Sequence, residues 1–454
     1  MRITENHCEY VRKQPRFNGL ERFENRIFLS SPMYYGDEND YFEKALENGE
    51  DNIYTLEEFV AKYHGVRYMA AVSSVTAAVH LALKLAAEKL YGSSSGISTP
   101  SGTGRGGALF GKRVFCPDFC SADIVNPVLY EGGEPIFIDA SDLDWGMDPE
   151  VLSMAFEKYP DVKIVIASHI YGFTMKIKKI KKICEEHGAL LIEDASESFG
   201  AKVEGSGRVG RFGDIGILGF NEDSIVSGFG GGAVLTNDLY EYRKVKYWSE
   251  GSLATPQWRQ HDELGYDYRM DPLKAVMIAS QMVHLDESIA KKKAIYEHYK
   301  EQLDETIMPI NYINKGDEPN YNITGMICDS NICFEEARTD RHYVFSAAHG
   351  TASPMEIYEG LEAFNVESRS MYKPMHLQPV FRMYEQITLD GGIRQYEDFY
   401  QDNYSLRCDR SLWLFNSGIC LPSDLRMTEE EQDIVVAIIG ACFDKPDLNR
   451  LAWG

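Results

Sequence analysis

The chain has 454 residues, of which 44% are hydrophobic and 12% aromatic, so it is long enough to form two domains with sizeable apolar cores. Its formal net charge of -24 argues against nonspecific nucleic-acid binding, which depends on clustered lysine and arginine, and no run reaches the roughly 18 apolar residues of a membrane span. The nine cysteines are odd in number and scattered, which indicates neither a disulfide framework nor a zinc site, and no metal is expected.

The chain is expected to begin with an N-terminal arm over residues 1–26, followed by a large domain over 27–283. The arm starts MRITENHCEYVRKQPRF, which carries charges but no apolar segment, so we expect no secretory signal and a cytoplasmic protein. LEEFVAKYHG predicts an amphipathic helix that ends at Gly65, and TAAVHLALKLAAEKL predicts a long buried helix. Residues 91–107 are rich in glycine and serine, which favours a flexible surface insertion over a phosphate-binding loop.

Five short apolar runs bounded by turn residues follow the insertion and predict buried parallel strands: RVFCPDF, EPIFIDA, KIVIASH, ALLIED and DIGILGF. TMKIKKIKKICEEHG predicts the crossover helix between the third and fourth of these strands, with Gly188 at its C-terminus. GFGGGAV lacks the spacing of a phosphate loop and predicts a turn into a further strand, AVLTND. The expected fold class is therefore α/β, with a mostly parallel sheet flanked by helices.

A smaller C-terminal α+β domain is expected over residues 284–454, beginning with the charged helix DESIAKKKAIYEHYKEQLDE. The segment just before it predicts a helix with a stripe at helical spacing, made of Leu273, Val276, Met277, Ser280 and His284. Such a stripe is available for burial either in a dimer interface or in a core within one chain.

Candidate chemistry lies at the carboxyl ends of the predicted strands, where open α/β sheets bind their ligands. Five segments stand at such places: SSVTAA, CPDFCSADIVNP, HIYG, EDASESFGA and GFNEDS. Together with IFLSSP, GYDYRMDPLKAVMIASQMVHLDE, ESRSMYKPMHLQPVF and GICLPS, they resemble the DegT/StrS family of nucleotide-sugar aminotransferases, which depend on pyridoxal phosphate (PLP). The matches are in order and cover nearly the whole chain. The resemblance implies the fold type I architecture of aspartate aminotransferase and a role in surface glycan synthesis.

The resemblance also implies roles for individual residues of a cofactor site. Asp194 matches the aspartate that pairs with the pyridine nitrogen of PLP, and Glu197 matches a position facing the ring hydroxyl. Thr76 matches the threonine that binds the phosphate at a helix N-terminus, beside Ser74. Helix capping is an alternative role for Asp194 and for Thr76.

The chain departs from the family pattern at this same site. Ser224 occupies the position of the lysine that would hold PLP, and Gly219 replaces the serine five residues before it. An alcohol cannot do the work of that amine at neutral pH. Three further departures surround the expected cofactor: Val75 for a glycine beside the phosphate, Ser121 for an aromatic residue that stacks on the ring, and Asp267 for an asparagine that reaches a partner's phosphate.

Tyr171, Arg369 and His376 still match family positions near the expected nucleotide sugar, and arginine is suited to a diphosphate. Packing under the smaller domain is the alternative for the segment that holds His376. Three functions stay open: a noncatalytic homologue or partner subunit, an active enzyme on a 3- or 4-keto nucleotide sugar, or a reused site with Glu197 or His169 as a base. PLP is expected from the family but weakly bound or absent, and the chain is expected to dimerise with itself or with an intact paralogue.

Overall fold

The structure is a computed structural model. It describes residues 3–49, 51–92, 107–255, 257–303, 310–328, 337–338, 343–344, 352–394 and 409–443. Most of the predicted glycine- and serine-rich insertion, residues 93–106, lies outside these ranges. Within them, every helix is too short or too polar to cross a membrane.

The large sheet has nine strands in the order β1-β9-β8-β5-β4-β2-β3-β16-β17. Its central strands β8, β5, β4, β2, β3 and β16 run parallel, whereas β1, β9 and β17 pair antiparallel with their neighbours. The strands are β1 (Tyr68–Val72), β2 (Arg113–Pro117), β3 (Glu134–Ile138), β4 (Ile164–Ser168), β5 (Leu190–Asp194), β8 (Ile215–Gly219), β9 (Gly232–Thr236), β16 (Gln386–Ile387) and β17 (Ile393–Arg394). All five predicted parallel strands are therefore present, and the glycine-rich turn leads into β9 as expected.

Helices cover both faces of this sheet, because its strands are apolar on both sides. In β4, Ile164 and Ile166 belong to one apolar core, while Val165 and Ala167 belong to the other. Both predicted helices before the insertion are present, and the predicted crossover helix is α7. The helices are α2 (Glu38–Asn48), α3 (Asp51–His64), α4 (Val75–Tyr91), α5 (Ala122–Tyr130), α6 (Pro149–Lys158), α7 (Ile177–Glu186), α8 (Leu239–Ser249) and α9 (Pro272–Met282). The chain thus has the expected α/β class.

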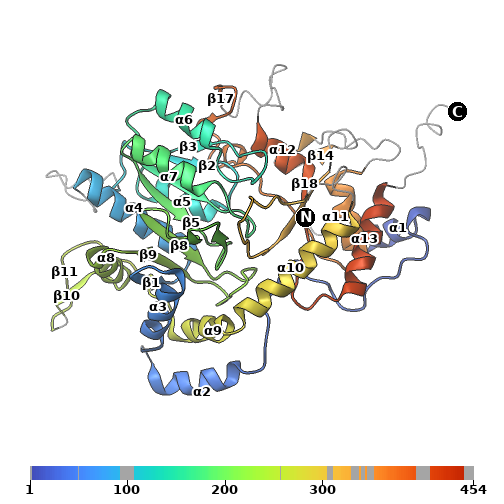
Figure 1. Cartoon of the computed structure of the whole chain (residues 1–454), viewed down its shortest axis with the longest axis horizontal. Coiled ribbons are helices and arrows are strands. Elements are labelled where there is room, and N and C mark those ends of the chain that lie inside the picture. The colour runs from blue at the N-terminus through green and yellow to red at the C-terminus, as the bar shows by residue number, and fades with distance from the viewer. Residues whose placement is uncertain are drawn as a thin grey trace.

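The C-terminal part combines helices with a three-stranded sheet of order β12-β18-β15. Figure 1 shows its helices gathered on one side of the large sheet. Strand β16 nevertheless pairs in parallel with β3, so the large sheet also takes strands from this part of the chain. The elements are α10 (Leu285–Gln302), β12 (Thr324–Ile327), α11 (Pro354–Ala363), β15 (Arg369–Ser370), η2 (Met375–Leu377), α12 (Arg410–Ser417), β18 (Gly418–Leu421) and α13 (Glu429–Phe443).

Three small hairpins complete the described strands. They are β6 (Lys202–Val203) with β7 (Gly207–Arg208), β10 (Leu253–Thr255) with β11 (Gln260–His261), and β13 (Ala337–Arg338) with β14 (Tyr343–Val344).

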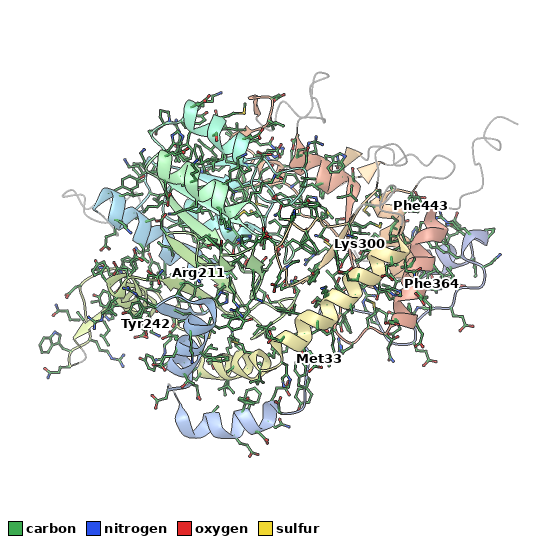
Figure 2. All side chains as sticks on the ribbon, viewed as in Figure 1. Met33, Arg211, Tyr242, Lys300, Phe364 and Phe443 are labelled. Carbon is green, nitrogen blue, oxygen red and sulfur yellow. The ribbon has the colours of Figure 1, made fainter. Side chains whose placement is uncertain are left out.

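The N-terminal arm lies against the C-terminal helices and contains α1 (Glu5–Arg12) and η1 (Pro15–Phe17). Arg26 forms two hydrogen bonds to the Glu362 carboxylate, at 3.1 and 2.8 Å. Phe17 is buried against the ring of Phe364, which Figure 2 shows among these helices. The arm is therefore packed against the C-terminal part of the chain.

Helix α9 carries the predicted stripe, but only part of that stripe is buried within the chain. Val276 and Ser280 are buried, whereas Leu273 is 49% exposed. The buried face is completed by Ala275, Ile278 and Met282, and α9 packs against helices α2 and α3.

Residue His64, at the end of α3, makes the stability of this fold depend on pH. It is 1% exposed and bonds through Nδ1 to the Val209 carbonyl at 3.0 Å. Burial lowers its pKa to about 4, against the opposing effect of that hydrogen bond. The pKa of His64 in the folded chain lies below its unfolded value near 6.5. The contribution of the neutral imidazole to the free energy of unfolding is therefore complete above pH 6.5 and is lost as the pH falls toward 4.

Removing this histidine is expected to make the free energy of unfolding depend less on pH at acidic pH. Between pH 7.5 and 4.5, His64→Gln should lose about 2.5 kcal/mol less of its free energy of unfolding than the parent chain does. Urea unfolding at the two pH values measures the difference, with exposed His261→Gln as the control. An equal loss in parent and variant would contradict the assignment.

Candidate active site

The candidate site is built at the carboxyl ends of β4 and β5, which are paired so that Ser168 lies opposite Asp194. Tyr171 follows β4 and has a φ of 55°, a left-handed conformation that is unusual for a bulky residue. Such backbone strain is often found at functional sites. The next residue, Gly172, has a φ of 96°, and a Cβ there would lie 2.0 Å from Asn320 Oδ1.

Asp194 is 3% exposed and accepts a hydrogen bond from the Ser196 backbone N–H at 3.0 Å. Burial raises the pKa of its carboxyl, and the hydrogen bond from the Ser196 backbone N–H opposes that shift. Among the residues that the structure describes, no cation forms an ion pair with this carboxylate. The site therefore offers a buried acid with which a cationic group of a ligand could pair.

The buried imidazole beside Asp194, that of His169, is held at both nitrogens. Its Nε2–H donates to Glu193 at 3.0 Å, and its Nδ1 accepts from the Met175 backbone N–H at 3.1 Å. A histidine fixed in this way has no free nitrogen with which to act as a base.

Glu197 lies at the centre of a second group of contacts. It accepts hydrogen bonds from the Tyr171 backbone N–H at 2.6 Å and from the Tyr372 hydroxyl. The rings of these two tyrosines stack with centroids 5.1 Å apart. Burial raises the pKa of Glu197 to about 7, in spite of both hydrogen bonds. Both oxygens of Glu197 thus already have partners within the chain.

The N-terminus of α4, where a phosphate is expected, is also occupied by internal contacts. Ser74 caps the helix and accepts from the Ala77 backbone N–H at 3.1 Å. Thr76 donates its hydroxyl proton to Asp123 at 3.1 Å. Two hydroxyl groups that the resemblance assigns to the cofactor are therefore engaged by the protein.

Val75 and Gly219 are packed against each other beside that helix terminus. Val75 is 2% exposed, and a Cβ placed on Gly219 would lie 2.8 Å from its Cγ2 and 2.7 Å from Ser196 Cβ. A serine at position 219 would therefore collide with the valine unless the chain shifted. The two departures from the family pattern fit together as one packed pair.

Ser224 is 8% exposed and lies in the loop between β8 and β9. Next to it, Asp223 pairs with Arg369, with 3.2 Å between the carboxylate and the guanidinium. Both residues line a cavity of about 430 Å³ that contains three carboxylates and one arginine. Its walls are Leu29, Ser30, Asn221, Glu222, Asp223, Phe229, Gly230, Glu367 and Arg369.

Lys292 of α10 contacts Ser30 in the wall of this cavity, and the sequence analysis did not predict it. It is 1% exposed and donates to Ser30 Oγ at 2.9 Å and to the Asn322 carbonyl at 2.8 Å. Ser30 in turn donates to the Asp223 carbonyl at 3.3 Å. Burial lowers the pKa of Lys292 to about 8, although Asp424 and Asp223 oppose that shift. The sequence offers one indication that Lys292 is buried, namely its helical spacing from other buried residues of α10. The run of three lysines that contains it obscures this indication.

The other candidates lie apart from this cluster. Ser121 caps α5, and Asp267 is exposed in a β-bridge with Glu250. His376 is 1% exposed and pairs through Nδ1 with Asp118 at 2.8 Å, away from the cavity walls. Burial opposes its charge, but Asp118 and Asp409 raise its pKa to about 9. The structure thus brings together Tyr171, Glu197 and Arg369 with the Ser224 loop.

Known proteins resemble the chain along most of its length. The family model described as DegT/DnrJ/EryC1/StrS aminotransferase matches residues 37–440. EpsN of Bacillus subtilis, named provisionally as a pyridoxal phosphate-dependent aminotransferase, is 30% identical over 436 residues, which cover 94% of this chain and 98% of EpsN. GDP-perosamine synthase of Vibrio cholerae is 28% identical and covers 78% of this chain and 87% of its own.

Solved structures agree with the fold. DesI, crystallised in the presence of its TDP-sugar product, has a TM-score of 0.73 at 18% identity and covers 96% of this chain and 97% of its own. A DegT DnrJ EryC1 StrS aminotransferase from Brucella abortus has a TM-score of 0.69 at 20% identity, covering 90% of this chain and 98% of its own. The chain belongs to the DegT/DnrJ/EryC1/StrS aminotransferase family.

Proposed function

We propose that this chain is a noncatalytic member of its family, a cytoplasmic partner subunit that has lost PLP-lysine chemistry and binds PLP weakly or not at all. The observation that carries the proposal is Ser224 at the position of the cofactor's lysine. A hydroxyl group cannot condense with an aldehyde as an amine does, nor shuttle protons as that amine does at neutral pH.

The contacts around the α4 terminus support the same conclusion. A phosphate held there would need hydroxyl and N–H donors, yet Ser74 and Thr76 are engaged within the chain. The methyl group of Val75 fills the space beside Gly219. Each lost hydrogen bond to a charged group costs roughly 1.5–3 kcal/mol, so two such losses would weaken binding about 100-fold or more.

The ligand class that fits the family is a nucleotide sugar, as the name GDP-perosamine synthase of one relative indicates. Arg369 is the group in the cavity that suits a diphosphate, although Asp223 already pairs with it. In this proposal the cavity retains a binding role in glycan synthesis without a catalytic one.

The decisive experiment exposes the purified chain to PLP and then to borohydride, which fixes PLP to any lysine that holds it. We expect no visible absorbance of bound cofactor and no specific mass increase, because position 224 offers no amine. Intact-protein mass spectrometry and peptide mapping measure the result. One stoichiometric modified lysine would overturn the proposal.

The alternative is an active aminotransferase or dehydratase-like enzyme on a 3- or 4-keto nucleotide sugar. It is favoured by Lys292, a buried amine near the Asp223 loop with a pKa of about 8, and by Glu197, a carboxyl with a pKa of about 7. Modification of Lys292 in the borohydride experiment would select this alternative.

The chain is also expected to be a dimer, either with itself or with an intact paralogue. Two-fold dimers are the commonest soluble oligomers, and several large apolar side chains near α9 are exposed: Phe229 at 58%, Leu273 at 49% and Val283 at 57%. Light scattering should give twice the chain mass, and Leu273→Glu should reduce it without unfolding the protein. A monomer at micromolar concentration, unchanged when the paralogue is added, would contradict this expectation.

A further inference from the structure

A second cavity, of about 350 Å³, lies in the C-terminal part of the chain. It forms where α10, the segment before β12 and helix α12 meet the loop that follows β3. Figure 2 labels one residue of its wall, Lys300 of α10. The described walls of this cavity and of the cavity beside Arg369 share no residue. Those that matter here are Asp142, Trp145, Lys300, Asn311, Tyr312 and Trp413.

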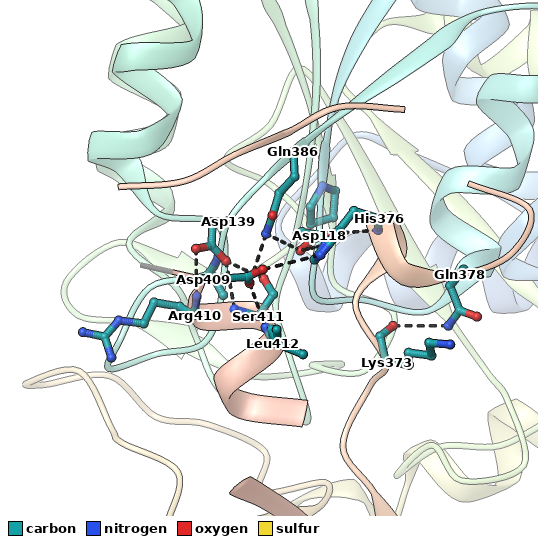
Figure 3. A network of polar contacts seen from close by, with 12 residues as sticks. Asp118, Asp139, Lys373, His376, Gln378, Gln386, Asp409, Arg410, Ser411 and Leu412 are labelled. Atoms are coloured by element: carbon teal, nitrogen blue, oxygen red, sulfur yellow. Dashed lines mark hydrogen bonds and ion pairs between the residues drawn. The ribbon is translucent and has the colours of Figure 1, made fainter. Parts of the chain in front are cut away.

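The helix that carries Trp413, α12, is fixed at its N-terminus. Asp139, which follows β3, accepts hydrogen bonds from the backbone N–H groups of Arg410 at 2.9 Å and Ser411 at 2.8 Å (Figure 3). The first N–H groups of a helix have no partner within the helix, so this carboxylate satisfies two of them. The contact holds α12 against the large sheet, and this side of the cavity is therefore formed without a ligand.

Trp145 enters the wall from a tight loop after β3. The Ser141 backbone N–H closes this loop with a hydrogen bond to the Gly146 carbonyl at 2.8 Å. Trp145 has a φ of 58° and is 4% exposed. A left-handed backbone is unusual for a bulky residue, and such strain gathers at sites that hold ligands. The conformation of this loop therefore supports a binding role for the wall.

Asn311 contributes a buried amide to the wall and is 2% exposed. Its Oδ1 accepts a hydrogen bond from the Gly325 backbone N–H, which sets the orientation of the amide. Its Nδ2 is buried and has no hydrogen-bond partner in the part of the chain that the structure describes. Buried donors without a partner are uncommon in native proteins. An oxygen atom of a ligand would supply the missing acceptor.

Aromatic side chains are the prevailing feature of the wall, and the ring of Tyr312 is the most accessible of them, at 46% exposed. The face of an aromatic ring carries partial negative charge and attracts the slightly positive C–H groups on the face of a sugar ring. Small-molecule sites have volumes of about 300–1,000 Å³, so this cavity suits a small ligand. The aromatic residues are Trp145, Tyr296, Tyr312 and Trp413.

The charges of the wall argue against an anionic ligand. Asp142 pairs with Arg410, whose guanidinium lies 5.8 Å from the centre of the Trp413 ring. Lys300 is the one cation among the described residues of the wall. A diphosphate would therefore meet the Asp142 carboxylate, and like charges about 4 Å apart repel each other. A wholly apolar ligand would leave polar groups of the wall unpaired. A neutral ligand with hydroxyl groups and an apolar face avoids both costs.

We propose that this cavity binds a neutral carbohydrate of about one or two pyranose rings. One ring stacks on Tyr312 and Trp413, and its hydroxyl groups bond to Asp142 and to Asn311 Nδ2. The wall is assembled from segments far apart in the sequence, so no local motif indicates the site. The inference goes beyond the proposed function and does not rest on it.

Titration of the purified full chain with cellobiose, maltose and N,N′-diacetylchitobiose tests the site by calorimetry and tryptophan fluorescence. We expect saturable binding of at least one disaccharide and a change of tryptophan emission, because Trp145 and Trp413 lie in the wall. Tyr312→Ala should weaken that binding about tenfold or more, as loss of an aromatic anchor does. The matched control is Tyr10→Ala, which removes a tyrosine of α1 that is 65% exposed, and it should keep the affinity.

UDP-glucose separates this site from the cavity beside Arg369. It should not displace the bound disaccharide, and any binding of its own should be the same in Tyr312→Ala. Displacement would place the disaccharide in the other cavity and overturn the proposal. Failure of all three disaccharides to bind, or equal affinities of Tyr312→Ala and the parent chain, would also overturn it. If Tyr312→Ala does not fold, crystals of the parent chain grown with the disaccharides decide: sugar density in this cavity supports the proposal, and its absence contradicts it.

Discussion

Glu131→Ala is expected to lower the free energy of unfolding by about 3–5 kcal/mol, as removal of one partner from a buried charge cluster does. The Glu131 carboxylate lies 2.7 Å from His80 Nε2 and 3.7 Å from Lys84 Nζ, and both of these side chains are at most 5% exposed. It also accepts a hydrogen bond from the Ala108 backbone N–H at 2.6 Å. Burial works against its charge, but the His80 hydrogen bond and the Lys84 charge lower its pKa to about 2.

The matched control for this prediction is Glu134→Ala, three residues along the chain. Its side chain is 59% exposed and lies 3.8 Å from Arg113, so its removal should change stability by less than about 1 kcal/mol. Urea unfolding of the two variants at pH 7 measures the difference. Similar midpoints for both would show that the buried cluster contributes little.

Ser224→Lys alone is expected not to restore transamination, because the ring and the phosphate of the cofactor would still be poorly held at four positions: Val75, Ser121, Gly219 and Asp267. Adding Val75→Gly, Gly219→Ser, Ser121→Phe and Asp267→Asn should raise PLP affinity about 100-fold or more over the single variant, because Gly219→Ser and Asp267→Asn each recover a hydrogen bond to a charged group. Titration with PLP and an assay of amino transfer from glutamate measure both effects. Substantial activity from Ser224→Lys by itself would show that the surrounding changes matter little.

The packed pair can be tested without any cofactor. Gly219→Ser should destabilise the parent chain by about 1–3 kcal/mol through overpacking, and by less in a Val75→Gly background. The coupling between two contacting residues typically amounts to 0.5–3 kcal/mol. If the two substitutions change the free energy of unfolding additively, Val75 and Gly219 are not energetically coupled, which would contradict the packed pair.

The elements of the large sheet could be predicted from sequence because each is marked by local chemistry. Strands β2, β3, β4, β5 and β8 are short apolar runs bounded by turn residues, and their lack of alternation follows from burial on both faces. Strand β16 could not be found in this way, because it consists of two residues whose pairing with β3 is set by tertiary contacts.

Part of the site is predictable from the ends of such strands, because Asp194 ends β5 and Tyr171 and Glu197 follow β4 and β5. Arg369 is predicted through the family resemblance. The contact between Val75 and Gly219 joins positions far apart in the chain, and neither residue alone indicates the other. Lys292 was not predicted because the residues on both sides of it are also lysines. Only its position on the buried face of α10 distinguishes it from them.

The packing of the N-terminal arm has a consequence for synthesis on the ribosome. Arg26 and Glu362 are 336 positions apart, and Phe17 is buried against Phe364. The arm is made first, but its binding surface emerges almost last, so the nascent chain must carry an undocked apolar segment through most of translation. Long-range contacts of this kind slow folding and expose surface to aggregation. Docking of the arm therefore comes late in folding, after strands β1 to β9 have been synthesised.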